Sequence, residues 1–256
     1  MVRYEIMGAL RIHDGAGYRT VGARKMEILL LALLIRGERG ASVEELMSEI
    51  WGGNPPRRAH ATLHVYVSQL RKFLGRCDGH SPIVTRAPGY ALTLGQDTLD
   101  LHTFQALVDS GRRHVRAGQH ELAVETLRRA LVQWRGGALF SLRNGPIVNS
   151  FGAWLEEARL ECVELLVESK LALGWYRELV GFLTGLIEEY PLREGFYRQL
   201  MIVLCRSERR ADALRVFQSA RRALSEELGL EPGWALQEAH RAALAARDDL
   251  DLSHVD

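Results

Sequence analysis

The first third of the chain opens with short segments in which hydrophobic and polar positions alternate. Val2, Tyr4 and Ile6 alternate with charged side chains, which is typical of a half-buried strand. The pattern predicts short strands within residues 2–12 and 17–22, and the glycine-rich stretch between them predicts a turn.

Two helices are predicted next. The segment 24–36 is rich in leucine and is followed by Gly37, a residue that often follows the last turn of a helix. Ser42 and Glu45 have the S-x-x-E spacing of a capping box, so a short helix is predicted over residues 43–50.

A proline-containing loop leads into a longer helix and a hairpin. Residues 51–56, WGGNPP, interrupt the helical pattern, which resumes over residues 57–74. Two β-like runs, 83–86 and 90–94, are joined by Ala-Pro-Gly and predict a hairpin. A helix, a capped short helix, a loop, a longer helix and a hairpin follow one another in this order in winged-helix domains.

The rest of the chain has a helical pattern arranged in pairs. The predicted pairs are 101–117 with 121–134, 154–173 with 176–190, and 194–206 with 210–228. The turns at Gly174 and Ser207 are 33 residues apart, close to the period of about 34 residues of tetratricopeptide repeats. The first pair is out of register because of an interruption at 135–152. A plain helical bundle remains the alternative.

The helix predicted over residues 57–74 has one apolar stripe and one basic, hydrogen-bonding face. The stripe, expected to be buried, consists of Leu63, Val67, Leu70 and Leu74. The other side contains no acidic residue and comprises Arg58, Ala61, Thr62, His64, Val65, Ser68, Gln69, Arg71 and Lys72. Such side chains suit the phosphates and base edges of a DNA major groove. A solvated amphipathic helix is the alternative.

Neither a metal site nor a catalytic site is predicted. His60 and His64 are four residues apart, but the segment lacks the glutamate of H-E-x-x-H and the sequence indicates no third ligand. No Ser/His/Asp or Cys/His arrangement has support. Four tryptophans are interpreted as packing anchors at helix starts or turns rather than as ligand-stacking groups: Trp134, Trp154, Trp175 and Trp234.

Composition adds a charge asymmetry to this picture. The 256 residues carry a net charge of +1, but residues 1–95 carry +5 and residues 96–256 carry −4. This asymmetry hints at a nucleic-acid contact confined to the first domain. Three scattered cysteines, including Cys77, suit a reducing compartment. The longest apolar run has eight residues, where a membrane span needs about 20, so a cytoplasmic protein without a membrane segment is expected.

Two stretches of sequence resemble a known family. WGGNPPRRAHATLHVYVSQLRKFLG followed by IVTRAPGYAL resembles the OmpR-type winged helix-turn-helix, and more specifically that of the Streptomyces antibiotic regulatory proteins. VQWRGGAL and EYPLREGFYRQLMIVLCRSERRADALRVF are similar to the bacterial transcriptional activation domain of that family. The resemblance implies a mostly α fold with a small β content. It places a winged-helix domain at 1–95 and an all-α, tetratricopeptide-like domain at 96–256.

The resemblance also implies a function and its residues. The family comprises transcriptional activators of antibiotic biosynthetic clusters, which bind direct repeats near the −35 region as tandem protomers and recruit RNA polymerase holoenzyme. The implied DNA contacts are Arg57, Arg58, Ala61, Thr62, His64, Val65, Tyr66, Ser68, Gln69, Arg71, Lys72 and the wing residue Arg86. The implied polymerase-contacting loop is Trp51, Gly52, Gly53, Asn54, Pro55 and Pro56. Catalytic residues, metal ions and cofactors are not expected.

One departure and one rival hypothesis stay open. Ala61, Ser68 and Gln69 stand where some OmpR-type readers have arginine, which puts those phosphate contacts in doubt. The rival hypothesis is a helical adaptor that binds only protein and uses the winged helix as an interaction module. An enzyme is a more distant alternative.

Overall fold

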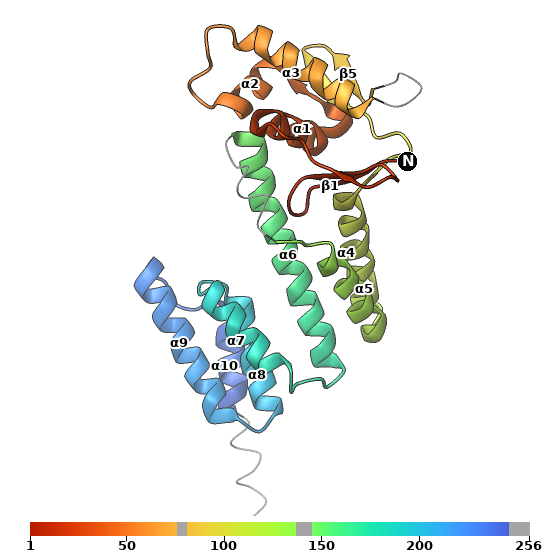
Figure 1. Cartoon of the computed structure of the whole chain (residues 1–256). Helices are drawn as coiled ribbons and strands as arrows, with labels where there is room; N and C mark the ends of the chain where they lie inside the picture. The colour runs from red at the N-terminus through yellow and green to blue at the C-terminus, as the bar shows by residue number, and fades with distance from the viewer. Residues whose placement is uncertain (76–80, 137–144, 246–256) are drawn as a thin grey trace, which may run out of the picture. The chain divides into compact units, whose positions relative to one another are not determined.

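The computed structural model describes residues 1–75, 81–136 and 145–245 (Figure 1). Cys77, part of the predicted interruption (137–144) and the last residues of the second expected domain (246–256) lie outside these ranges. The chain divides into two compact units. The first comprises Met1–Asp109 and Arg128–Cys162; the second comprises Ser110–Leu127 and the residues from Val163 on.

The first unit begins with a small sheet that the alternating pattern predicts. Its strands are β1 (Arg3–Glu5), β2 (Arg11–His13), β3 (Tyr18–Arg19) and β7 (Thr98–Leu99), in the order β3-β2-β1-β7. β1 and β2 pair in antiparallel fashion, whereas β7 adds to β1 in parallel. The parallel strand comes from beyond residue 95, so this sheet extends past the first domain expected from the sequence.

Three helices and a second sheet form the winged helix. They are α1 (Arg24–Arg36), the short 3-10 helix η1 (Gly37–Arg39), α2 (Val43–Trp51), α3 (Ala59–Leu74), and the strands β4 (Ala41–Ser42), β5 (Ile83–Arg86) and β6 (Gly89–Leu92). The antiparallel order β4-β6-β5 makes β5 and β6 the predicted hairpin. Both hydrogen bonds of the predicted capping box link Ser42 and Glu45.

The core of this winged helix forms around α1. Every residue from Ile28 to Leu34 is at most 3% exposed, so the leucine-rich helix is buried on all sides. α2, α3 and β6 pack against it, and Leu46, Leu63 and Leu92 of these elements are buried. Gly89 is required here because a Cβ at this position would lie 2.1 Å from the Ala41 carbonyl oxygen across the β4–β6 pair.

A buried charged cluster ties the first sheet to the chain that follows it. The Asp100 carboxylate, at the start of α4 (Asp100–Arg116), accepts hydrogen bonds from the backbone N–H groups of Ile6 and Met7. Arg135 forms ion pairs with Asp100 (3.0 Å) and with Glu5 (3.2 Å). Because an unpaired buried carboxylate is costly, these contacts hold β1 against α4 and the segment after α5 (His120–Val132).

The second buried carboxylate corrects the predicted start of a helix. We expect an interruption at 135–152, but α6 spans Pro146–Ala172. Proline fits the first helical position, where no N–H is needed. Glu49 of α2, fully buried, accepts the next two N–H groups, those of Ile147 (2.7 Å) and Val148 (3.1 Å). The cap comes from almost 100 residues away, so local sequence does not reveal it.

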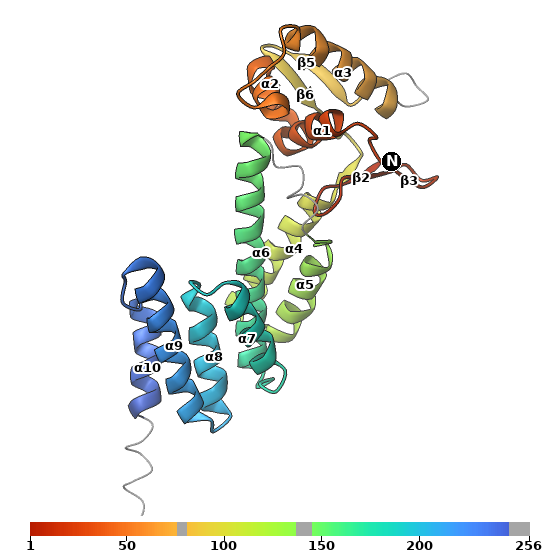
Figure 2. The ribbon, with the colours of Figure 1, turned by 60° about the vertical axis from the view of Figure 1, so that its left-hand side comes forward.

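The second unit is helical, as predicted. Figures 1 and 2 both show α7 (Leu179–Glu189), α8 (Glu194–Arg206), α9 (Arg210–Leu228) and α10 (Trp234–Ala245) side by side. α8 packs against α7, α9 and α10. Gly174 and Ser207 follow α6 and α8 and lie in the turns to the next helix, as the repeat spacing predicts. A mostly helical fold with small sheets is therefore confirmed.

Other element boundaries differ by a few residues. α3 begins at Ala59 rather than at residue 57, Trp51 is the last residue of α2 rather than part of the loop, and α7 begins at Leu179 rather than at 176. The sequence pattern does not predict α10 as a separate element. The division of the chain into domains at residue 95 stays a prediction.

Candidate nucleic-acid interface

The helix α3 has the two faces that its sequence predicts. Leu63, Val67 and Leu70 are at most 1% exposed, and Leu74 completes the buried stripe. On the other side lie the exposed residues that we call the α3 face: His60, Ala61, His64, Val65, Ser68, Gln69 and Lys72. Val65, a large apolar side chain, is 52% exposed. An apolar group among hydrogen-bonding side chains suits a base edge with a thymine methyl.

Two arginines lie just before α3. Arg57 and Arg58 are exposed, and Arg58 is the N-cap residue without a side-chain cap hydrogen bond. The Arg58 carbonyl accepts a hydrogen bond from the Thr62 hydroxyl at 3.0 Å. Positive side chains at the positive end of a helix dipole are unfavourable by some tenths of a kcal/mol in the free protein. A phosphate bound at this end of the helix would make the position of these two arginines favourable.

The predicted contact Arg71 has an internal role. Its Nε donates to the Ile83 carbonyl (3.1 Å) and its Nη2 donates to the Thr85 hydroxyl (2.8 Å). Its guanidinium also lies over the ring of Tyr90, 5.7 Å from the centroid. Arg71 therefore ties α3 to the hairpin, and a direct DNA contact by this residue stays a prediction.

The wing residue Arg86 is exposed at the end of β5, as expected. Its Nη1 donates to the Glu38 carbonyl at 2.6 Å, which links the hairpin to η1. The guanidinium has four more N–H groups that can reach an anion. A groove contact by Arg86 thus remains compatible with this geometry and stays a prediction.

Tyr90 is the residue of this surface that sequence reasoning misses. It lies on β6, is only 6% exposed, and its hydroxyl is 2.6 Å from Nδ1 of His64 on the α3 face. Its place in a strand of alternating pattern signals burial but not the partner of its hydroxyl. Tyr66, a predicted contact, is half-buried and stacks on Trp51 with ring centroids 6.1 Å apart.

The predicted polymerase loop has an anchored start and an exposed end. The Trp51 ring stacks on Tyr66 and also contacts the ammonium group of Lys25, which is 5.5 Å from the ring centroid. Gly52 ends α2 with a φ of 61°, a backbone conformation that favours glycine. The four following residues, Gly53, Asn54, Pro55 and Pro56, are exposed. This placement leaves these four residues accessible to a partner.

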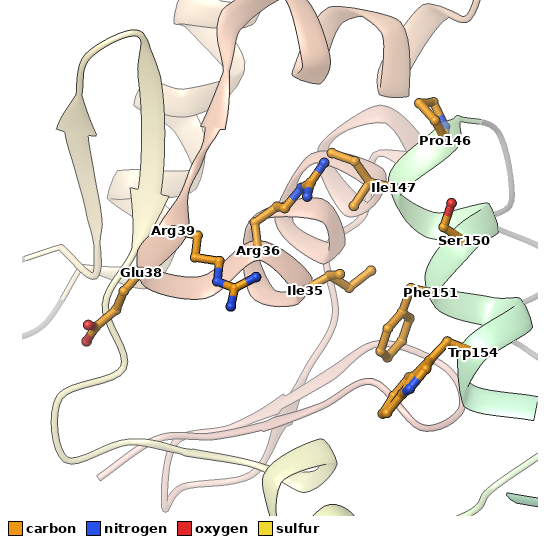
Figure 3. Close-up of a pocket in the computed structure, with 9 residues that line it drawn as sticks. All are labelled: Ile35, Arg36, Glu38, Arg39, Pro146, Ile147, Ser150, Phe151 and Trp154. Atoms are coloured by element: carbon orange, nitrogen blue, oxygen red, sulfur yellow. The ribbon is translucent and has the colours of Figure 1, made fainter. Parts of the chain in front are cut away.

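A pocket of about 560 Å³ lies elsewhere in the first unit, between the end of α1 and the start of α6 (Figure 3). Phe151 and Trp154 stack on one side, with ring centroids 5.7 Å apart, and Ile35 and Arg39 lie across from them. Trp154, Trp175 and Trp234 are 44%, 43% and 74% exposed. Trp154 and Trp175 still bury more than half of their surface, which stays compatible with a packing role, whereas Trp234, the first residue of α10, is mostly exposed and does not act as a packing anchor.

The described residues contain neither a metal-binding cluster nor a membrane-spanning helix. Among the described residues, no group of three or more His, Cys, Asp or Glu side chains is placed to hold a metal ion. No helix in the part of the chain that the structure describes has the length and apolar content that a membrane span needs.

Comparisons with known proteins agree with the two-part architecture. Residues 15–92 match the family model described as "Transcriptional regulatory protein, C terminal", and residues 99–244 match that of the "Bacterial transcriptional activator domain". Regulatory protein DnrI of Streptomyces peucetius is 33% identical over 257 residues, which covers 98% of this chain and 94% of that protein.

Two other matches are longer proteins. Regulatory protein AfsR of Streptomyces griseus is 36% identical over 249 residues, but this chain covers only 25% of its length. The structure of EmbR of Mycobacterium tuberculosis, in complex with a low affinity phosphopeptide, matches with a TM-score of 0.89 and 30% identity, over 96% of this chain and 65% of that one. The names of these relatives and the two matched domain families describe regulators of transcription and not enzymes. The chain belongs to the Streptomyces antibiotic regulatory protein family of transcriptional activators.

Proposed function

We propose that this activator binds direct repeats near the −35 region of promoters in an antibiotic biosynthetic cluster. Two protomers bind in tandem and recruit RNA polymerase holoenzyme, in the cytoplasm where the DNA is. The observation that carries the DNA contact is the α3 face, exposed and free of acidic residues beside an arginine-bearing hairpin. The proposed contacts are the twelve residues that the family resemblance implies.

The buried side of α3 supports placing its outer face in the major groove. Because Leu63, Val67 and Leu70 fix the helix in the core, its outer side chains are held in a rigid array. Side chains on a rigid helix lose little freedom on binding, which favours base readout. The exposed loop residues after Trp51 are the proposed polymerase contact.

A salt titration tests the DNA contact against the rival adaptor hypothesis. A reader that neutralises several phosphates loses affinity steeply as salt rises, by about 0.9 in the log–log slope per contact. We expect that slope in filter binding with promoters of a neighbouring biosynthetic cluster, together with a footprint on repeated sequences. Absence of any DNA binding at low salt would favour the adaptor.

Repeat spacing tests the tandem arrangement separately. Two protomers docked on the same face of the duplex need repeats about one helical turn, 10–11 bp, apart. Inserting about 5 bp between the repeats moves the second site to the opposite face, so we expect cooperative binding to disappear while each site retains its own affinity. Unchanged cooperativity would contradict the tandem model.

A further inference from the structure

The hydroxyl of Tyr90 forms a short contact with a side chain of the α3 face. Its Oη lies 2.6 Å from Nδ1 of His64, and the two rings meet edge-on with centroids 6.2 Å apart. Tyr90 is 6% exposed and has the Arg71 guanidinium over its ring, while Arg71 is itself tied to β5. The hydroxyl is thus fixed by the hairpin, whereas His64 is exposed on α3.

This contact determines which ring nitrogen of neutral His64 carries the proton. A phenol hydroxyl can donate to Nδ1 or accept from Nδ1–H. If it accepted, its own proton would need another acceptor, and no described residue supplies one to Oη. If it donates, both groups are satisfied, whereas a buried polar group left without a hydrogen-bond partner is costly. The hydroxyl therefore donates to Nδ1, and the histidine proton is on Nε2.

We propose that Tyr90 is a positioning residue for DNA readout: it fixes His64 as a hydrogen-bond donor on the α3 face. No residue of the described part of the chain forms a hydrogen bond with Nε2 of His64, so its N–H is available to an external acceptor. Guanine offers two acceptors in the major groove, N7 and O6, whereas cytosine offers only its N4 donor. At the one base position that faces His64, the protein therefore prefers guanine to cytosine. This step rests on the proposed placement of α3 in the major groove.

The first experiment tests the tautomer without DNA. Long-range ¹H–¹⁵N NMR of the histidine rings in the full chain is recorded at about pH 8, well above the range in which free histidine takes up a proton. We expect His64 to be the Nε2–H tautomer in the wild type and a mixture of both tautomers in Tyr90→Phe. An Nδ1–H tautomer in the wild type would overturn the proposal, whatever the protein binds.

The second experiment tests the readout by selection from randomised duplexes. In Tyr90→Phe, we expect guanine-over-cytosine discrimination at one position to fall about tenfold, the effect of about 1.4 kcal/mol, with the other positions unchanged. Tyr18→Phe is the matched control, because Tyr18 also packs edge-on against a histidine, His13, but lies on β3 and forms no hydrogen bond to it. His64→Gln should alter the preference at the same position.

The outcomes separate this proposal from the proposed function. A wild-type base profile in Tyr90→Phe, with the melting temperature unchanged, would overturn the role of Tyr90 even though DNA binding is real. Equal loss at all positions would also overturn it, since a tautomer acts on one base. If the wild type selected no DNA at all, the proposed function would fail, while the NMR result would still stand on its own.

Discussion

The arginines next to α3 and those of the second unit differ in whether they form ion pairs within the protein. At the start of α9, Arg209, the N-cap residue, and Arg215 both pair with Asp212, and Arg221 further along the helix pairs with Glu231 at 2.8 Å. Hydrogen bonds from Arg215 and then from Arg209 hold the pKa of Asp212 below its usual value. At the start of α3, by contrast, Arg57 and Arg58 form no ion pair with any described residue.

The difference indicates where an external anion is expected. Exposed ion pairs contribute little to stability, but they do cancel charge and leave a surface without a strong preference for phosphate. Unpaired arginines at a helix N-terminus leave a positive potential that only a ligand can neutralise. This contrast supports the proposal that DNA binds on the α3 side of the first unit rather than at the arginine-rich α9.

The largest expected effect comes from cutting the chain at residue 95, which tests whether the DNA-binding surface folds alone. The fragment 1–95 lacks Asp100 and Arg135, so the N–H groups of Ile6 and Met7 and the buried Glu5 lose partners. It also lacks the α6 N-terminus that Glu49 caps. Each lost charge-assisted hydrogen bond costs about 1.5–3 kcal/mol. The loss of several together removes a large part of a domain's typical free energy of unfolding.

Circular dichroism melts of 1–95 and of the full chain measure this effect. We expect no cooperative transition in the fragment, and hence weak DNA binding. A cooperative melt with retained sequence specificity would show instead that the boundary expected from the sequence marks an autonomous domain. In vitro transcription with this fragment would then show whether activation needs the helical remainder of the chain.

The second prediction compares the two arginines before α3 with two arginines at the start of α9. Replacing Arg57 and Arg58 together by alanine should lower DNA affinity at least tenfold and reduce the salt slope by about two units, since each arginine is proposed to neutralise one phosphate. The matched variant replaces Arg209 and Arg215 by alanine, which removes the same charge from α9. In filter binding over a salt series, the DNA affinity and the salt slope of that variant should equal those of the wild type. Equal losses in both would show that only net charge matters.

The third effect concerns Arg86, which is both exposed and hydrogen-bonded. Arg86→Ala should lower affinity several-fold and reduce the salt slope by about one unit, with little change in melting temperature, because its contact with the Glu38 carbonyl is solvent-exposed. A lower melting temperature with normal affinity would assign Arg86 to holding the hairpin against η1.

What the sequence predicts well is local. The stripe Leu63, Val67, Leu70 and the capping box at Ser42 each depend on residues a few positions apart, and all are confirmed. The start of α6 and the tie between Arg71 and Thr85 depend on contacts that only the fold creates. The same holds for Tyr90, whose partner is 26 residues away on another element.

The smallest expected effect is a pH dependence in the second unit. The His240 ring stacks on Phe217 with centroids 3.8 Å apart, and burial lowers the pKa of His240 below its ordinary value of 6.5. Because the unfolded chain then takes up the proton first, stability is fully present above about pH 6.5 and is lost as pH falls toward the folded-state pKa. His240→Phe keeps an aromatic ring at this position and removes the titration. Between pH 7.5 and 5.5 the melting temperature should therefore fall slightly more in the wild type than in the variant. Parallel decreases would mean that the stacked imidazole protonates without a cost to folding, and the arginine–carboxylate pairs of α9 would then be the groups to examine for the acid response.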